Sequence, residues 1–210
     1  MLRALVTGAA LLASLVAGVP AQAKPVPTPD DLMTIDVVNA NGSGCPAGST
    51  KIAVAPDNTA FTVTYSKYLA QAGPKASPID FRKNCQLALS IKVPNGFTFA
   101  IASADYRGFA SLARGAWAQS SANYYFQGHT RTTRNEHTFR GPYDDDWQRT
   151  DTLAITAMSF LGCNERRNLN INTDLRVNRG SSSRSETNFI SMDSTDSAIS
   201  TVYRVAWKKC

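Results

Sequence analysis

The sequence contains few of the residues that usually carry catalysis or hold metals. It has two histidines, His129 and His137, and its glutamates lie only at positions 136, 165 and 186. Its four cysteines are far apart, whereas zinc sites use close pairs such as CxxC. We find no GxSxG elbow, no P-loop and no dinucleotide fingerprint. These absences disfavour the corresponding classes of enzyme and predict no metal and no cofactor.

Long apolar runs are also missing, apart from one at the start of the chain. Arg3 precedes this run, and Ala21-Gln22-Ala23 has the small-x-small pattern of a signal-peptide cleavage site. We therefore expect residues 1–23 to be a signal peptide, since a transmembrane anchor needs about 20 apolar residues. Residues 24–34 are rich in proline and predict an extended leader. The expected mature protein is secreted and has no membrane span.

An even number of cysteines in an exported protein indicates disulfides. Four cysteines allow three pairings, and the sequence does not decide among them. We favour Cys45–Cys85 and Cys163–Cys210, because each bond then ties one half of the chain. A bond at Cys210 also holds a terminus that would otherwise fray.

The net charge is +6 at pH 7, and loss of Arg3 with the signal peptide leaves +5. A modest positive charge favours anionic surfaces such as cell-wall polymers or acidic lipids, although it also serves solubility alone. Nucleic-acid binding is disfavoured, because the basic residues are not interleaved with aromatic side chains. We expect a monomer with an unidentified extracellular partner or polysaccharide.

Alternating apolar residues predict strands throughout the region that follows the leader. The strongest pattern spans residues 85–112, where two alternating runs flank Pro94-Asn95-Gly96 and predict a β-hairpin. Residues 51–54 and 60–65 predict a second hairpin. A loop of about a dozen residues is expected between Tyr68 and Asp80. Roughly 8–10 short strands predict an all-β fold, a disulfide-bonded antiparallel β-sandwich forming a single domain over 35–210, with a closed β-barrel as the alternative.

One group of polar residues flanks the predicted hairpin. Asp80 and Arg82, like Asp105 and Arg107, are two positions apart, so the members of each pair share one face of a strand. They form either an ion-pair network that fixes the neighbouring loop or a polar binding patch that includes Tyr106. Arginines lower the pKa of nearby carboxyl groups, which argues against a general acid in this patch.

Three further groups have a binding interpretation and a structural one. The histidines and Glu136 indicate either a metal site or solvated strand ends, and Asp144-Asp145-Asp146 either a calcium loop or an acidic turn. Exposed aromatic residues would stack on carbohydrate, whereas buried ones would belong to the core. The residues concerned are Trp117, Tyr124, Tyr125, Phe126 and Trp147.

Several stretches of the sequence resemble one known family. They are SPIDFRKNCQLALSIKVPNGFTFAIASADYRGFASL at 77–112, YYFQG at 124–128, GSGCPAGS at 42–49 and the terminal WKKC. They are similar to the domain of unknown function 4360 family, small secreted proteins of fungi and filamentous bacteria. The resemblance runs from about Asp36 to Cys210. It implies a secreted, disulfide-bearing β domain and brings no established activity.

We therefore expect a secreted, non-enzymatic β-sandwich that binds a cell-wall or extracellular polysaccharide or a protein partner. One alternative is an extracellular hydrolase acting on a polymer, which would need a cleft with two carboxyl groups. Another is an inhibitor or toxin-like factor that acts through a protruding loop at 66–80.

Overall fold

The computed structural model describes residues 28–129, 133–152, 160–192 and 200–210, and their regular structure is entirely β-strand. The described residues form twelve strands, more than expected, because several short strands show no clear alternation in the sequence. They are β1 (Thr34–Asn41), β2 (Thr50–Val54), β3 (Ala60–Tyr65), β4 (Leu69–Ala72), β5 (Arg82–Lys92), β6 (Phe97–Leu112), β7 (Trp117–Phe126), β8 (Thr133–Arg140), β9 (Tyr143–Thr152), β10 (Asn168–Asn178), β11 (Asn188–Met192) and β12 (Thr201–Lys209).

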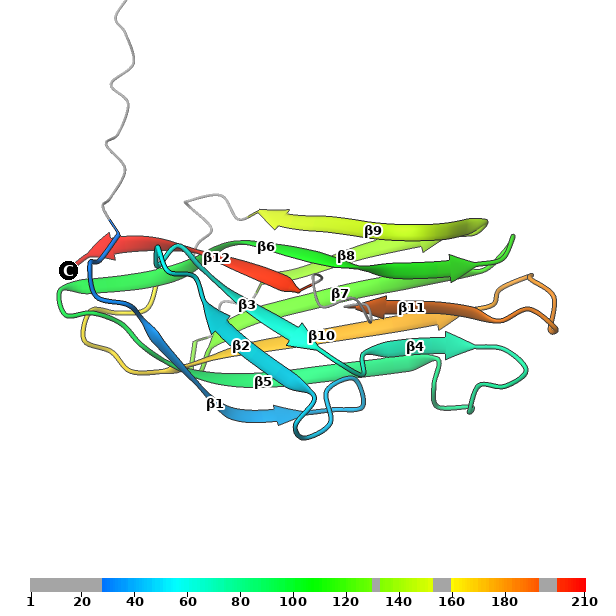
Figure 1. The fold of residues 1–210 in the computed structure, drawn as a ribbon, viewed down its shortest axis with the longest axis horizontal. Helices are drawn as coiled ribbons and strands as arrows, with labels where there is room; N and C mark the ends of the chain where they lie inside the picture. Colours follow the sequence, from blue (N-terminus) through cyan, green and yellow to red (C-terminus); the bar gives the residue numbers. More distant parts are fainter. Residues whose placement is uncertain (1–27, 130–132, 153–159, 193–199) are drawn as a thin grey trace, which may run out of the picture.

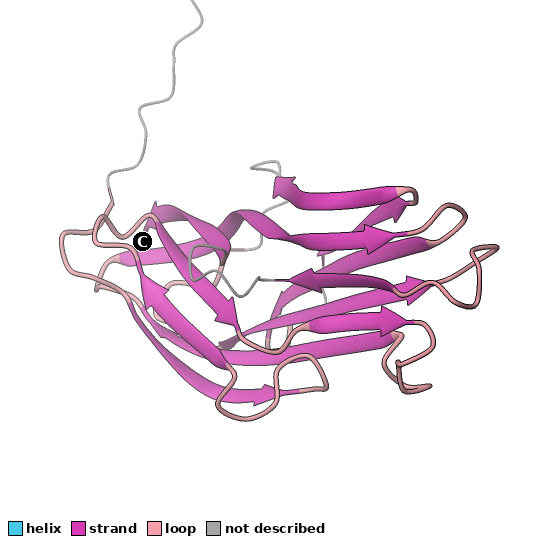
Figure 2. Ribbon diagram, turned by 45° about the vertical axis from the view of Figure 1, so that its right-hand side comes forward, coloured by secondary structure: helices cyan, strands magenta, loops and turns pink. Residues whose placement is uncertain are grey.

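The strands form two antiparallel sheets that pack face to face (Figures 1 and 2). The first sheet has the order β1-β5-β10-β7-β8. The second has the order β2-β3-β12-β6-β11-β4, with β9 paired to the other edge of β6. The predicted single β-sandwich is therefore confirmed, and the closed barrel is not.

The longest strand, β6, organises the second sheet. Its 16 residues pair with β9 along one edge, and with β12 and then β11 along the other. Gly108 lies where β11 approaches most closely, because a Cβ atom there would be 1.9 Å from the Ser191 carbonyl oxygen. A glycine at this position thus permits the two strands to pair.

Alternating side chains from both sheets fill the space between them, as period-two burial requires. In β10 every second residue from Leu169 to Val177 is buried, and β5 shows the same alternation from Cys85 to Ile91. Aromatic rings occupy the centre, where Phe61 stacks on Tyr203 with their centroids 5.0 Å apart. This core spans the full width of both sheets.

The strands of the 85–112 stretch are present, but the predicted hairpin is wrong. β5 belongs to the first sheet and β6 to the second, so the turn at Pro94-Asn95-Gly96 crosses between sheets. Alternation identifies the buried face of a strand but not its partner, and here β5 pairs with β1 and β10, whereas β6 pairs with β12, β11 and β9. The hairpin predicted from 51–54 and 60–65 is correct, since β2 pairs with β3.

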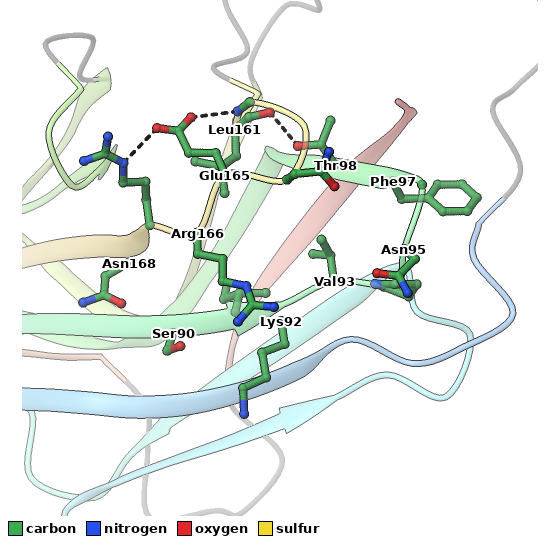
Figure 3. A pocket seen from close by; sticks show the side chains of 16 residues that line it. Ser90, Lys92, Val93, Asn95, Phe97, Thr98, Leu161, Glu165, Arg166 and Asn168 are labelled. Atoms are coloured by element: carbon green, nitrogen blue, oxygen red, sulfur yellow. Dashed lines mark hydrogen bonds and ion pairs between the residues drawn. The ribbon is translucent and has the colours of Figure 1, made fainter.

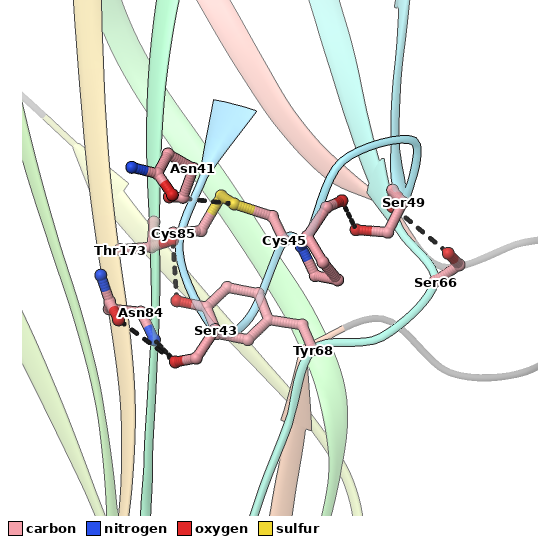
Figure 4. Close-up of a disulfide and its surroundings, with 10 residues drawn as sticks. Asn41, Ser43, Cys45, Ser49, Ser66, Tyr68, Asn84, Cys85 and Thr173 are labelled. Atoms are coloured by element: carbon pink, nitrogen blue, oxygen red, sulfur yellow. Dashed lines mark hydrogen bonds between the residues drawn. A yellow bond between two sulfur atoms is a disulfide. The ribbon is translucent and has the colours of Figure 1, made fainter. Parts of the chain in front are cut away.

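Two disulfides join Cys45 to Cys85 and Cys163 to Cys210, the same pairs that the sequence analysis favoured. Both sulfurs of the first bond are in the core, where it ties the loop after β1 to β5 (Figure 4). The second bond joins the segment before β10 to the C-terminal residue. Neither cysteine of that second pair is buried.

Some predicted boundaries change. The loop expected between Tyr68 and Asp80 contains β4, and the acidic run at 144–146 belongs to β9 rather than to a turn. The described end of the expected leader packs on the domain, since the Met33 amide donates to Asn58 Oδ1 over 3.0 Å. The expected signal peptide, residues 1–23, lies outside the described residues. No helix in the described part of the chain has the length and hydrophobicity of a transmembrane segment.

Candidate functional site

The first half of the polar group predicted from sequence stabilises a loop. Asp80 lies just before β5 and accepts hydrogen bonds from Lys83 Nζ at 2.8 Å and from the Ser77 amide at 2.9 Å. The bond from Lys83 is the main reason that the pKa of Asp80 is lowered. Arg82 Nε donates to Asp174 Oδ2 on β10 over 2.5 Å. Both acidic groups are therefore engaged by basic side chains.

The second half lies in the other sheet. Asp105 accepts hydrogen bonds from Arg204 and, over 2.7 Å, from Thr150 Oγ1. Tyr106 points to the opposite side and is buried against Tyr203, whereas Arg107 is exposed. The five predicted residues thus form two separate groups, one on each sheet. The expected single patch does not form, because i, i+2 spacing fixes a face within a strand but not the sheet it joins.

Asp105 gives a pH-dependent prediction. Burial raises its pKa, but the hydrogen bonds from Thr150 and Arg204 and the nearby arginine charges outweigh burial, so the pKa lies below its usual 3.8. The fold therefore favours the charged form at neutral pH, and this contribution is lost as the pH falls through the lowered value. We expect Asp105→Asn to lower stability by roughly 1 kcal/mol at pH 7, since Arg204 is partly exposed.

Urea unfolding of both proteins between pH 7 and pH 2 measures this effect. The difference between wild type and Asp105→Asn should shrink below about pH 4 as the wild-type carboxyl becomes protonated. A difference that stays constant over the whole range would show that charge on Asp105 does not stabilise the fold.

The histidines do not meet. His137 Nε2 lies 2.6 Å from Asp151 Oδ1, while His129 lies 3.7 Å from Glu165. Glu136 instead accepts a hydrogen bond from Arg134 Nε. Within the described ranges no cluster of three or more His, Cys, Asp or Glu side chains is placed to hold a metal ion.

The predicted aromatic group divides between the core and one surface. Tyr124, Phe126 and Trp147 are buried. Trp117 and Tyr125 are half-buried on the outer side of β7, where they lie eight residues apart. At ~3.4 Å per residue this separation is roughly 27 Å. Only these two members of the group are available for stacking on a ligand.

The outer side of the first sheet carries a dense set of carboxamides, which we call the polar face. It consists of the outward side chains of β5, β10 and β7, in register across the three strands. Successive rows are Ala88–Asn170–Tyr125, Gln86–Asn172–Asn123, Asn84–Asp174–Ser121 and Arg82–Arg176–Gln119. Each of these strands buries its alternate residues, so the polar side chains lie on the outer side of the sheet, where Ser121 is itself covered.

Few hydrogen bonds join the carboxamides of this face to one another. Asn172 Nδ2 donates to the Tyr125 hydroxyl over 3.5 Å, which is a long bond. Asn123 Oδ1 is covered and has no hydrogen-bond partner among the described residues. Two other carboxamides have partners at the borders of the face, since Asn84 Oδ1 accepts from Ser43 Oγ over 3.2 Å and Gln119 Nε2 donates to Glu136 Oε2 over 3.5 Å. A carboxamide offers two donors and one acceptor oxygen, so these bonds leave part of the bonding capacity of the polar face for a ligand.

A pocket of about 340 Å³ opens where the polar face ends (Figure 3). Its walls are the end of β5, the turn at 94–96, the start of β6 and the segment 161–168. Ser90 and Asn168, which are partners in the β5–β10 pairing, line the pocket and begin the polar face. The pocket and the face therefore form one continuous surface, which we take as the candidate site.

The sequence analysis did not single out residues 168–178 as a site, although apolar and polar residues alternate along them. The signal was present, because the polar positions of that strand are asparagines at 168, 170, 172 and 178. The assembly into a face required the pairing of β10 with β5 and β7, which joins segments far apart in the chain.

Comparison with known proteins identifies a relative and a family. An uncharacterized secreted protein of the fungus Arthroderma benhamiae is 33% identical over 184 residues, which cover 88% of this chain and 74% of that protein. This relative and the disulfide-bonded fold identify the present protein as secreted. A family model described as a domain of unknown function, DUF4360, matches residues 31–210, and the chain belongs to that family.

Proposed function

We propose that this protein is a non-enzymatic binding protein whose polar face binds an extracellular polysaccharide. The observation that supports the proposal is the row-by-row arrangement of carboxamides across β5, β10 and β7. Sugar hydroxyls both donate and accept hydrogen bonds, as carboxamides do. Such a surface suits a hydroxyl-rich polymer better than an apolar one.

The two half-buried aromatic residues of β7 also favour a polysaccharide as the ligand. Tyr125 lies within the rows of carboxamides, and Trp117 lies at the far end of the same strand. Aromatic rings offer an apolar body with a polar tip, which fits the faces and edges of a sugar ring. Their separation favours an extended chain over a single sugar.

The hydrolase alternative has less support. A glycosidase needs a pair of carboxyl groups, one of which stays protonated through a raised pKa. Among the residues that the structure describes, the carboxyl groups with displaced pKa values are displaced downward, by hydrogen bonds to neighbouring groups; they are Asp57, Asp80, Asp105 and Glu165. This direction is wrong for a general acid and favours a binding role.

Co-sedimentation with insoluble chitin, β-1,3-glucan, cellulose and peptidoglycan tests the proposal. We expect the secreted protein to be recovered with at least one polymer. Asn172→Ala should weaken that binding roughly fivefold and Tyr125→Ala roughly tenfold, through loss of a hydrogen bond and of a stacking surface. Recovery with none of the polymers would refute the proposal.

Gln148→Ala provides the matched control. Gln148 is an exposed carboxamide of β9, paired with Arg107 in the second sheet. Its removal changes the same chemical group away from the polar face and should leave binding unchanged. An equal loss in Gln148→Ala and Asn172→Ala would show that the polar face is not the binding surface.

A further inference from the structure

We propose that the end pocket binds an anionic group, a carboxylate or a phosphate, carried by the polysaccharide. This inference rests on the proposed function, because the polar face would hold the adjoining part of the same chain. It assigns the polymer to the acidic class.

The charges of the pocket lining favour an anion. Three cations, Lys92, Arg166 and Arg167, line it with a single acid, Glu165. Arg167 Nε donates to Glu165 Oε1 over 2.8 Å, so this pair is largely neutralised. Lys92 shares its charge with Asp36 on β1, so Arg166 leaves an excess of one positive charge at the opening.

Arg166 has the position and the freedom to bind the anion. Its side chain extends from the 161–168 segment toward β5, so that the guanidinium lies near Lys92 and Ser90 (Figure 3). It forms no ion pair or hydrogen bond with any described residue. A guanidinium binds a carboxylate or phosphate through two parallel hydrogen bonds, which makes Arg166 the main expected contact.

Lys92 is a weaker contact, because it already has a partner. Its Nζ lies 3.4 Å from Asp36 on β1, and both side chains are more than 60% exposed, at 68% and 65%. An exposed pair of this kind contributes little and is screened by salt. Lys92 therefore adds long-range attraction at the pocket rather than a fixed hydrogen bond.

The pocket wall is held in place before a ligand arrives. Thr98 Oγ1 donates to the Leu161 carbonyl over 2.6 Å, and the Cys210 amide donates to the Gly96 carbonyl over 2.9 Å. The Cys163–Cys210 disulfide ties the 161–168 segment to this C-terminal residue, which in turn holds the turn at 94–96. A preformed wall lowers the entropy cost of binding.

The pocket adjoins the polar face, and this arrangement favours a polymer over a free anion as the ligand. Asn168, the first residue of β10, lines the pocket, and Asn170 and Asn172 follow it along the outer side of the strand. A chain lying along β10 would thus place a charged substituent beside Arg166. Neutral sugar units would lie over the carboxamides.

Titration of the 15N-labelled protein with single sugars tests the pocket alone. The probes are galacturonate for a carboxylate and glucose 6-phosphate for a phosphate, with galactose and glucose as neutral controls. We expect the backbone amide signals of Ser90, Arg166 and Asn168 to shift with one or both acidic sugars at concentrations at which the neutral sugars cause no shift. Arg166→Gln should weaken this binding roughly tenfold, through loss of a charge-assisted contact.

Arg184→Gln removes the same charge from an exposed loop beyond the far end of β10 and should leave the affinity unchanged. An equal loss in both variants, or no shift of the pocket amides with either acidic sugar, would overturn the inference. A response to only one acidic sugar would support it and identify the anion as carboxylate or phosphate.

Co-sedimentation separates this inference from the proposed function. If the protein is recovered with none of the four polymers while galacturonate still shifts the pocket amides, the pocket stands and the polysaccharide role of the polar face fails. If Arg166→Gln binds the three neutral polymers and peptidoglycan, which carries carboxylates, as the wild type does, the polar face stands and the pocket assignment fails. Where both hold, salt should weaken acidic-polymer binding more in the wild type than in Arg166→Gln.

Discussion

Replacing His137 with alanine should destabilise the protein by roughly 3 kcal/mol, because it removes the main partner of a buried carboxyl group. His137 Nε2 lies 2.6 Å from Asp151 Oδ1, and the Asp151 side chain is only 4% exposed. Tyr124 would remain as a partner, since its hydroxyl donates to Asp151 Oδ2 over 3.4 Å. That long bond cannot replace the histidine.

Tyr124 is a fixed part of this cluster. Burial, followed by the charge of Asp151, raises the pKa of the Tyr124 phenol well above its ordinary value, so the hydroxyl keeps its proton and acts as a donor. Asp151 lies on β9 and Tyr124 on β7, so the hydrogen bonds join the two sheets at their open edge. Loss of His137 therefore removes its contact with Asp151 and also weakens the attachment of β9 to the first sheet.

Equilibrium unfolding in urea measures the effect, and His129→Ala is the matched control. His129 faces Glu165 at 3.7 Å, with both side chains 29% exposed, so its loss should cost less than about 1 kcal/mol. For a chain of this size the larger effect corresponds to a melting temperature about 6–12 °C lower. His137→Gln keeps a side-chain donor and should recover part of the loss. Equal stability of His137→Ala and His129→Ala would show that the Asp151 pair does not hold the sheets together.

The His137–Asp151 pair also shows where sequence reasoning ends. Residues 137 and 151 belong to adjacent strands in the chain, β8 and β9, yet these strands lie in different sheets. The alternation of apolar residues cannot reveal such a crossing, because it specifies a face and not a neighbour. The same limit explains why the stretch at 85–112 resembled a hairpin and why Asp80 and Asp105 are not neighbours.

Features that depend on local chemistry could be predicted. The all-β class follows from period two, and the core residues of β5 and β10 are the apolar members of each alternating run. The turn at Pro94-Asn95-Gly96 is present, with Gly96 at a positive φ of 79°. The polar face could be predicted only in part. Its asparagines can be read from the sequence, but their alignment in rows is known only once the pairing of β5, β10 and β7 is known.

Removing the Cys45–Cys85 disulfide should destabilise the protein by at least about 4 kcal/mol, the chain-entropy estimate for a closed loop of 40 residues. Both cysteines are fully buried. The loop that carries Cys45 packs closely on its surroundings, since a Cβ atom at Gly44 would lie 2.2 Å from the Tyr68 ring. Tyr68 in turn donates from its hydroxyl to Thr173 Oγ1 over 3.0 Å (Figure 4). Loss of the bond should therefore loosen packing between the sheets in addition to freeing the loop.

The Cys163–Cys210 bond provides a control for the contribution of chain entropy to the loss of stability expected without the Cys45–Cys85 bond. Its sequence separation of 47 is close to the 40 of the first bond, so chain entropy predicts nearly equal losses for the two double variants, Cys45→Ala/Cys85→Ala and Cys163→Ala/Cys210→Ala. We expect the first variant to lose more, because its bond lies in the core while the second joins two unburied residues. Urea unfolding of both variants measures the difference between their losses of stability. Mass mapping of the wild type without reduction should find no free thiol. Equal losses would mean that the buried bond acts only by constraining the unfolded chain.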